Sequence, residues 1–330
     1  MMIQSRAEID KWQQTIAEIR EQIGKVIVGQ REAIEQLLWC IFAGGHALFE
    51  GIPGLGKTVL VRTVADALDL SFSRIQFTPD LMPSDITGTN LIHFGQRGET
   101  AYEFQKGPIF GNLVLADEIN RATPKTQSAL LEAMQEKTVT VGSATHRLPE
   151  PFFVLATQNP LENEGTYPLP EAQLDRFLLK IFVSYPSREE LKEIVRRTTA
   201  PKQERAEKRA SGELVREIQE GAKEILISDD VLDYAARLVM MTHPEEADAP
   251  ESVKKYVRFG SGPRGLQAIV SVSRVKALMD GRLHVSIQDI GQTELPALRH
   301  RLLLSFEGQA LGVSPDRIIG EIVRKLEGSR

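Results

Sequence analysis

The sequence is poor in cysteine and has no excess of basic residues. Its single cysteine, Cys40, excludes an internal disulfide and a cysteine-rich zinc site, and it fits a reducing compartment. Lysine and arginine number 40 against 45 aspartates and glutamates, so the formal net charge of -5 offers no general positive field to a polyanion. A local basic patch is compatible with this total, but nucleic acid is not the expected partner.

The sequence also lacks a long apolar run. Its most apolar segment, residues 37–49, is interrupted by Gly44, Gly45 and His46 and is shorter than the ~20 residues that cross a bilayer. Acidic residues at positions 8 and 10 interrupt the start of the chain, where an export signal needs an apolar stretch. We therefore expect a cytoplasmic protein without a membrane span.

The chain has 330 residues, 42% of them hydrophobic, which is enough for two domains with packed cores. Up to Pro186, short apolar runs alternate with segments of helical periodicity, and this predicts an α/β fold with a parallel sheet covered by helices on both faces. The expected strands are residues 47–49, 72–77, 113–116, 152–156 and 178–183. The expected helices in this part include residues 7–23, 30–44 and 57–70.

Two insertions and a helical second half complete the pattern. Turn residues at 95–98 and 142–143 lie between β-rich arms, which predicts hairpins over residues 90–104 and 138–148. After Pro186 the expected helices are residues 188–199, 212–225, 228–241, 263–279 and 286–304, and the solvated connectors are residues 202–212 and 243–252. We expect a first domain over residues 1–186 and an all-α domain over residues 187–330.

A phosphate-binding loop is the strongest motif. Gly51-Ile52-Pro53-Gly54-Leu55-Gly56-Lys57-Thr58 fills every fixed position of the P-loop pattern G-x-x-x-x-G-K-[ST]. An apolar strand precedes it and a helical segment follows, so backbone N–H groups would face phosphate oxygens. Lys57 would balance phosphate charge and the Thr58 hydroxyl would bind Mg²⁺. The alternative, a glycine-rich turn with a chance lysine, does not explain the flanking strand and helix.

An acidic pair follows the strand at residues 113–116. Asp117 could hold the Mg²⁺ that Thr58 binds, and Glu118 could take a proton from a water that attacks the γ-phosphate. In isolation, such a pair is more often a solvated strand end, but the upstream P-loop weakens that interpretation. Glu118 therefore favours ATP hydrolysis over ATP binding alone.

Two further residues occupy positions that suit phosphate chemistry. Asn159 follows the strand at residues 152–156 and could hydrogen-bond the attacking water or the γ-phosphate; in isolation, an asparagine before Pro160 would more often start a turn. Arg176 precedes the last expected strand, where a guanidinium could stabilise a transferring phosphoryl group or could pair with Asp175 or Glu171.

These motifs, in this order, resemble an AAA+ ATPase, and four strings of residues resemble the MoxR family over nearly the whole chain. The strings are Asp117-Glu118-Ile119-Asn120-Arg121-Ala122, Gln127-Ser128-Ala129-Leu130-Leu131-Glu132-Ala133-Met134-Gln135-Glu136, Ala156-Thr157-Gln158-Asn159-Pro160 and Glu171-Ala172-Gln173-Leu174-Asp175-Arg176-Phe177. The resemblance implies a P-loop core with inserted hairpins, followed by a helical lid.

The resemblance also implies roles for individual residues. Asn159 would be sensor 1, Arg176 an arginine finger acting on a neighbouring subunit, and Arg264 sensor 2 at the start of a lid helix. Arg121 could be a second such arginine or could pair with an acid. The expected nucleotide contacts are Val28, Gly29, Gln30, Gly51, Pro53, Gly54, Leu55, Gly56, Lys57, Thr58, Val59, Asp117, Glu118, Asn159 and Arg264.

The expected activity is Mg²⁺-dependent ATP hydrolysis by a ring, as a homo-hexamer, that remodels or activates a partner protein. The resemblance implies a chaperone or metal-insertion role and a partner with a von Willebrand factor A domain. One alternative is a ring motor that translocates nucleic acid, which the acidic total charge and the few basic residues of the hairpins disfavour. Another is a nucleotide-gated scaffold with little turnover, which Glu118 and Arg176 disfavour.

Overall fold

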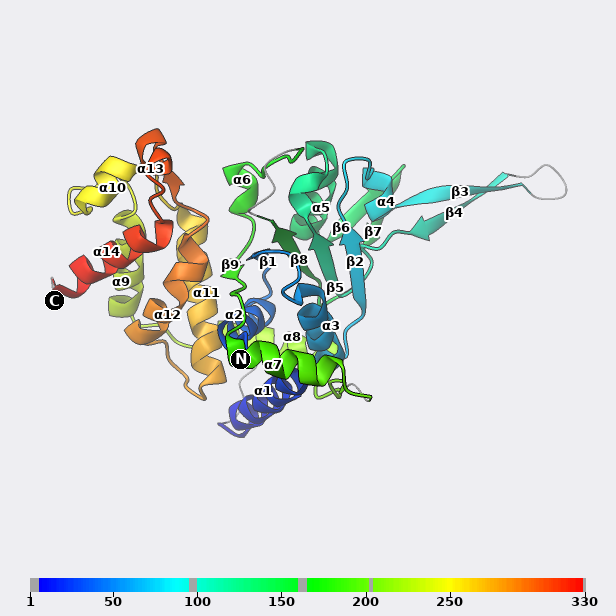
Figure 1. The fold of residues 1–330 in the computed structure, drawn as a ribbon, viewed down its shortest axis with the longest axis horizontal. Helices are drawn as coiled ribbons and strands as arrows, with labels where there is room; N and C mark the ends of the chain where they lie inside the picture. Colours follow the sequence, from blue (N-terminus) through cyan, green and yellow to red (C-terminus); the bar gives the residue numbers. More distant parts are fainter. Residues whose placement is uncertain (1–5, 95–99, 160–164, 202–203, 329–330) are drawn as a thin grey trace.

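The first half of the chain is built on a five-stranded parallel sheet of order β2-β5-β8-β1-β9 (Figure 1). The structure is a computed structural model that describes residues 6–94, 100–159, 165–201 and 204–328. The strands are β1 (Ala47–Glu50), β2 (Phe72–Gln76), β5 (Leu113–Asp117), β8 (Phe153–Gln158) and β9 (Leu179–Phe182). Each expected strand is present, with its ends within two residues of the prediction.

Both faces of the sheet are buried, which explains the continuous apolar strands. Along β5, Leu113 and Leu115 belong to one core cluster, and Val114 and Ala116 belong to the other. The first cluster includes residues of α1 (Arg6–Val26), α2 (Arg31–Phe42), α3 (Lys57–Leu68) and α8 (Gly212–Lys223). The second includes residues of α4 (Pro83–Thr87), η1 (Ile119–Arg121) and α5 (Pro124–Glu136). The α/β fold class is thus confirmed.

Two hairpins are inserted into the core, as the turn residues predict. The longer one, β3 (Gly88–Phe94) with β4 (Thr100–Lys106), projects far from the body of the molecule (Figure 1). Its predicted turn at residues 95–98 lies outside the described residues. The shorter hairpin joins β6 (Thr138–Val141) to β7 (Ala144–Arg147). Phe104 of β4 stacks on His146 of β7 with ring centroids 3.9 Å apart, so the two hairpins pack together at their bases.

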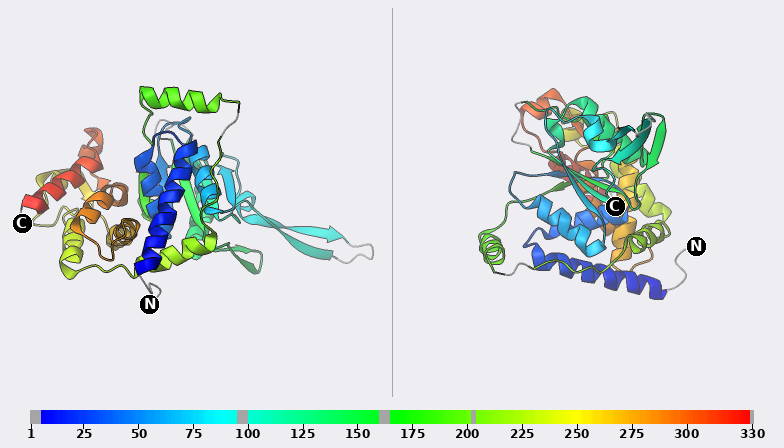
Figure 2. Two further views of the ribbon diagram at one scale, coloured as in Figure 1. Left: turned by 90° about the horizontal axis from the view of Figure 1, so that it is seen from below. Right: turned by 90° about the vertical axis from the view of Figure 1, so that its right-hand side faces the viewer.

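The rest of the chain is mainly helical. Its elements are α6 (Glu171–Leu174), α7 (Arg188–Thr198), α9 (Asp229–Met240), α10 (Glu251–Tyr256), β10 (Val257–Phe259), α11 (Pro263–Met279), α12 (Ile287–Leu298), β11 (Leu303–Leu304), α13 (Phe306–Ala310) and α14 (Pro315–Gly328). Figure 2 shows α9 to α14 gathered at one end of the molecule, opposite the long hairpin. We refer to residues 229–328 as the lid.

Three predictions for this half need comment. The helix expected over residues 286–304 ends at Leu298, because the chain turns there and β11 pairs with β10. The connector expected over residues 243–252 includes the start of α10 at Glu251. Arg197 of α7 donates to the carbonyls of Gly24 and Lys25 at the end of α1, at 2.9 and 2.7 Å. Residues of α8 also lie in the core cluster of the first half. Both helices follow residue 186 but pack on the first half, so the domain boundary at residue 186 stays a prediction.

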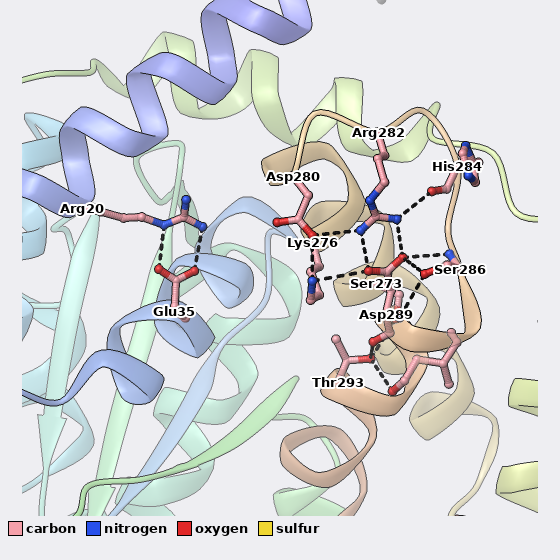
Figure 3. A network of polar contacts seen from close by, with 11 residues as sticks. Arg20, Glu35, Ser273, Lys276, Asp280, Arg282, His284, Ser286, Asp289 and Thr293 are labelled. Carbon is pink, nitrogen blue, oxygen red and sulfur yellow. Dashed lines mark hydrogen bonds and ion pairs between the residues drawn. The ribbon is translucent and has the colours of Figure 1, made fainter. Parts of the chain in front are cut away.

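An ion network centred on the buried Asp289 fixes α11 against α12 within the lid (Figure 3). The Asp289 carboxylate accepts two hydrogen bonds from Arg282, at 2.6 and 2.7 Å, and lies 3.4 Å from the Lys276 amine. Burial alone would raise the pKa of Asp289, but the bonds from Arg282 and Ser286 outweigh it and lower the pKa to about 2. The network thus holds α11 and α12 in one arrangement.

The buried Glu294 of α12 should make the stability of the folded chain depend on pH. It is 5% exposed, and burial, with a contribution from Glu327, raises its pKa to about 8 from an ordinary value of 4.5. The protonated side chain therefore stabilises the folded chain fully below pH 4.5, and this contribution is lost as the pH rises to about 8, at about 1.4 kcal/mol per pH unit. Glu294→Gln should weaken the fall in melting temperature between about pH 5.5 and pH 8.5. An unchanged pH dependence in this variant would contradict the assignment.

Candidate functional site

The predicted motifs meet at one edge of the sheet. Because all five strands are parallel, their carboxyl ends lie at the same edge. The P-loop follows β1, the Asp117-Glu118 pair ends β5, and Asn159 follows β8, which lies between the other two strands. Loops that are far apart in the sequence therefore converge on one site.

The P-loop has the geometry of an anion site. Gly54 and Gly56 have φ angles of +83° and +75°, which other residues rarely adopt, and a Cβ at either position would meet no described atom within 4 Å. No side chain in the described part of the chain caps the N-terminus of α3, where Gly56 is the cap residue. The first N–H groups of α3 are thus open to a phosphate. Thr58 lies in this first turn, and the Lys57 amine donates to the Gly51 carbonyl at 2.6 Å.

The charges around Lys57 connect the P-loop to the acidic pair. Burial lowers the pKa of the Lys57 amine, and the carboxylates of Asp117, Glu118 and Glu50 act in the opposite direction. Three carboxylates thus lie near one amine. This arrangement of hard oxygen atoms fits a nucleotide phosphate that arrives with a divalent cation.

Asp117 is held from two neighbouring strands. Its Oδ1 accepts a hydrogen bond of 2.6 Å from the Thr157 hydroxyl on β8, and its Oδ2 accepts two from Arg74 on β2, at 2.6 and 3.1 Å. Thr157 also accepts a 2.8 Å hydrogen bond from the backbone N–H of Glu118. Sequence reasoning missed Thr157 and Arg74, because their contacts depend on the order of the strands.

Glu118 is oriented by its own backbone and by two donors. Its φ of +58° is uncommon for a residue other than glycine and directs the side chain out of the line of β5. Its Oε2 accepts hydrogen bonds from Gln76 at 2.7 Å and from Arg121 at 3.0 Å. Arg74 donates to the Gln76 Oε1 at 2.5 Å, which fixes the amide with its NH₂ toward Glu118. Of the two interpretations of Arg121, the structure contains the pairing with an acid.

Thr157 offers a test of how the acidic pair is positioned. Thr157→Val keeps the shape of this buried side chain but removes both hydrogen bonds. We expect a loss of about 1–3 kcal/mol in unfolding free energy, because a buried N–H and a carboxylate oxygen lose their partner. We also expect kcat to fall by roughly tenfold or more with little change in KM, because Asp117 and Glu118 lose their alignment. Thr157→Ser should restore activity, and an equally inactive serine variant would contradict this role.

The expected nucleotide contacts at residues 28–30 lie on the side of the P-loop where β9 ends. Gln30 donates to the Ser184 carbonyl just after β9 at 2.7 Å, and Gly29 has a φ of +68°. A pocket of 280 Å³ adjoins the P-loop, and a groove of 860 Å³ adjoins Val28 and Gly29. The pocket is lined by Glu50, Gly51, Ile52, Leu55, Phe182, Val183 and Tyr185. Asn159 is 6% exposed, and Pro160 after it lies outside the described residues.

Arg176 and Arg264 lie at the opposite edge of the sheet. Arg176 precedes β9, and Asp175 beside it accepts a 3.5 Å contact from Arg264. Both arginines line a 370 Å³ pocket with Gly45 and His46, which precede β1. Because β1 has four residues, about 13 Å of strand separates this edge from the P-loop of the same chain. The two arginines are therefore close to each other and remote from their own P-loop.

Comparisons with known proteins match both halves of the chain. A profile of the ATPase family associated with various cellular activities (AAA) matches residues 46–179, and a profile of the AAA lid domain matches residues 250–322. Chaperone MoxR1 of Mycobacterium tuberculosis is 42% identical over 318 residues, which cover 96% of this chain and 82% of that protein. This chain belongs to the MoxR family of AAA+ ATPases. Protein MoxR of Methylorubrum extorquens is 28% identical over 94% of this chain and 95% of its own length.

A solved structure extends the likeness to three dimensions. A putative ATPase from Cytophaga hutchinsonii has a TM-score of 0.90 and 42% identity, and the match covers 97% of this chain and 96% of that one. The MoxR chain described here is thus an ATPase with a nucleotide-binding core and a lid. None of its described helices is long and apolar enough to span a membrane, and no group of three metal-ligating side chains occurs among the described residues.

Proposed function

We propose that this MoxR protein hydrolyses ATP at sites shared between neighbouring subunits of a ring, which we expect to be a hexamer. The observation that carries the proposal is the location of Arg176 and Arg264 at the sheet edge remote from their own P-loop. Arginines at that edge can reach a nucleotide only in another subunit, as a head-to-tail ring arranges. One subunit then supplies the P-loop and acidic pair, and its neighbour supplies the arginines.

The chemistry at each shared site follows from the residues present. Backbone N–H groups of the P-loop and the Lys57 amine bind the phosphates, and Glu118 accepts a proton from the water that attacks the γ-phosphorus. Asn159 positions this water, while Arg176 and Arg264 stabilise the charge on the transferring phosphoryl group. Mg²⁺ held by Thr58 and Asp117 would supply further charge neutralisation on the phosphates.

The proposed output is the remodelling of a partner protein. The long hairpin presents Leu91, Ile92 and Tyr102 with 40%, 50% and 71% of their surface exposed, and exposed apolar residues on a projecting element suit contact with protein. A relative carries the name Chaperone MoxR1, and the family resemblance favours a partner with a von Willebrand factor A domain. The net charge of -5 disfavours the nucleic-acid motor. Steeply salt-dependent stimulation of ATPase activity by DNA would support that motor instead.

The dependence of activity on protein concentration tests the shared site. We expect ATPase activity per subunit to rise with concentration as subunits assemble, and to be lost when EDTA removes Mg²⁺. Size-exclusion chromatography with light scattering would measure assembly in the same samples. Constant activity per subunit down to the monomeric state would contradict the proposal.

A further inference from the structure

Three consecutive residues of the lid, Arg299, His300 and Arg301, all contact β9 or the segment just before it. They follow α12; the side chains of Arg299 and Arg301 are 6% and 3% exposed, and His300 is 8% exposed. The strand β9 is the last strand of the described sheet, and it begins three residues after Arg176. We refer to Arg299, His300 and Arg301 together as the latch.

Arg301 makes the largest number of contacts in the latch. Its Nε donates to the Asp175 carboxylate at 2.8 Å, and its Nη atoms donate to the carbonyls of Asp175, Phe177 and Leu178 at 3.1, 2.8 and 3.1 Å. It also donates to the carbonyl of Ala297 near the end of α12. Only a planar guanidinium presents five donors in a fixed arrangement, so a lysine cannot reproduce this set of bonds.

His300 and Arg299 extend the contact along β9. The His300 Nε2 lies 2.9 Å from the Phe177 carbonyl and must carry the hydrogen, because a carbonyl only accepts. Arg299 donates to the Lys180 carbonyl at 3.4 Å, pairs with Asp316 at 3.0 Å, and lies 4.2 Å from the centre of the Phe182 ring. Phe182 lines the pocket beside the P-loop, so the latch follows β9 from the arginine edge to the nucleotide edge.

Asp175 connects the latch to Arg176 and Arg264, the two arginines at the sheet edge remote from their own P-loop. One oxygen of its carboxylate accepts from Arg301 and the other contacts Arg264 at 3.5 Å, while Arg176 is the next residue in the chain. Arg176 is itself bonded to the Leu131 carbonyl at 3.0 Å. Asp175 therefore contacts the Arg264 guanidinium directly and, through its bonds to Arg301, fixes the backbone from which Arg176 extends.

We propose that the latch is a positioning device that aligns Arg176 and Arg264 for the nucleotide of the neighbouring subunit. This inference rests on the proposed function, because it concerns the same shared site. Arg301 does not contact nucleotide; it acts through Asp175 and the backbone before β9. The latch thus makes the lid of one subunit part of the catalytic site of the next.

Arg301→Lys tests the latch, because lysine keeps the positive charge beside Asp175 but cannot reach the three carbonyls. We expect kcat to fall roughly 10- to 100-fold, as misplacement of a charge-stabilising group by about 1 Å does, with KM for ATP changed less than about twofold. Arg282→Lys is the matched control, since Arg282 binds Asp289 within the lid without contacting β9 (Figure 3). The control should keep its kcat. An equal loss in both variants would show general damage to the lid and would overturn the proposal.

Mixed assemblies separate a positioning defect from a defect in the subunit's own nucleotide site. An Arg301→Lys subunit keeps its P-loop, and a Lys57→Ala subunit keeps its arginines, so the mixture should be more active than the sum of the weakly active Arg301→Lys protein and the inactive Lys57→Ala protein. If the Arg176→Ala and Lys57→Ala mixture recovers activity but the Arg301→Lys and Lys57→Ala mixture does not, the latch proposal is overturned and the shared site stands. If neither mixture recovers, the shared site itself is wrong and the latch with it.

A second variant keeps the inference testable if Arg301→Lys does not fold. Asp175→Asn changes a carboxylate that is 31% exposed, and it weakens the contacts to Arg264 and Arg301 together. We expect the same loss of kcat and the same recovery in mixtures with Lys57→Ala. A fully active Asp175→Asn protein would overturn the proposal.

Discussion

Arg176→Ala should lower the rate constant of ATP hydrolysis by roughly 10³- to 10⁵-fold, the range found for arginines that stabilise a transferring phosphoryl group from a neighbouring chain. The affinity for ATP should change little, because the P-loop backbone and Lys57 bind the phosphates of the ground state, whereas Arg176 of the neighbouring subunit acts on the charge that develops in the transition state. Single-turnover hydrolysis and the binding of a fluorescent ATP analogue measure the two quantities separately. Both should be measured on assembled protein.

Arg196→Ala is the matched control for this variant. Arg196 lies on α7 with 75% of its side chain exposed, and its contact with Glu193 is a surface pair that contributes little. The control should hydrolyse ATP at the normal rate. If Arg176→Ala loses less than about tenfold, Arg176 does not stabilise the transition state and the shared site loses its main support.

Glu118→Gln is the second large effect that we expect. The amide keeps the size of the side chain but cannot accept the proton of the attacking water, so kcat should fall roughly 10²- to 10⁴-fold. ATP should remain bound, because the P-loop and Asp117 are unchanged. Glu132→Gln, at an exposed position on α5, serves as the control. Normal turnover by Glu118→Gln would remove Glu118 as the base.

The same variant can identify the partner protein. A chain that binds ATP without hydrolysing it should retain its partner, so Glu118→Gln used as bait with ATP should capture a protein that the same bait with ADP does not. A protein with a von Willebrand factor A domain in the ATP sample would support the proposed partner class. Equal capture with both nucleotides would contradict nucleotide-driven remodelling.

The sequence predicted the core well because its strands are continuous apolar runs and its phosphate loop has fixed glycine positions. Both signals are local, and the carboxyl ends of parallel strands necessarily share an edge. Lys57, Asp117, Glu118 and Asn159 each follow one of these strands, so their convergence on one site is predictable from the sequence. The positions of the two hairpins along the chain could also be predicted, because their turn residues are a local signal.

The contacts that orient the acidic pair could not be predicted in this way. Arg74 and Gln76 reach Asp117 and Glu118 only because β2 lies beside β5, and strand order is a tertiary property. The resemblance gave Arg264 the role of sensor 2, but only the lid contacts place it against Asp175. The lid was also where element prediction failed. The expected elements stop at residue 304, although the apolar spacing of α14 (Ile318, Ile319, Ile322 and Leu326) and the proline at its start are typical of an amphipathic helix.

The most direct test of the account uses mixtures of Arg176→Ala and Lys57→Ala subunits. Each protein alone should be inactive, because one lacks the arginine and the other lacks the phosphate-binding lysine. In a randomly mixed ring about a quarter of the interfaces pair an intact P-loop with an intact arginine, so activity should rise toward that fraction of the unmodified level. Activity that stays at the level of the separate variants at every mixing ratio, with mixed assembly verified, would contradict catalysis at a shared site.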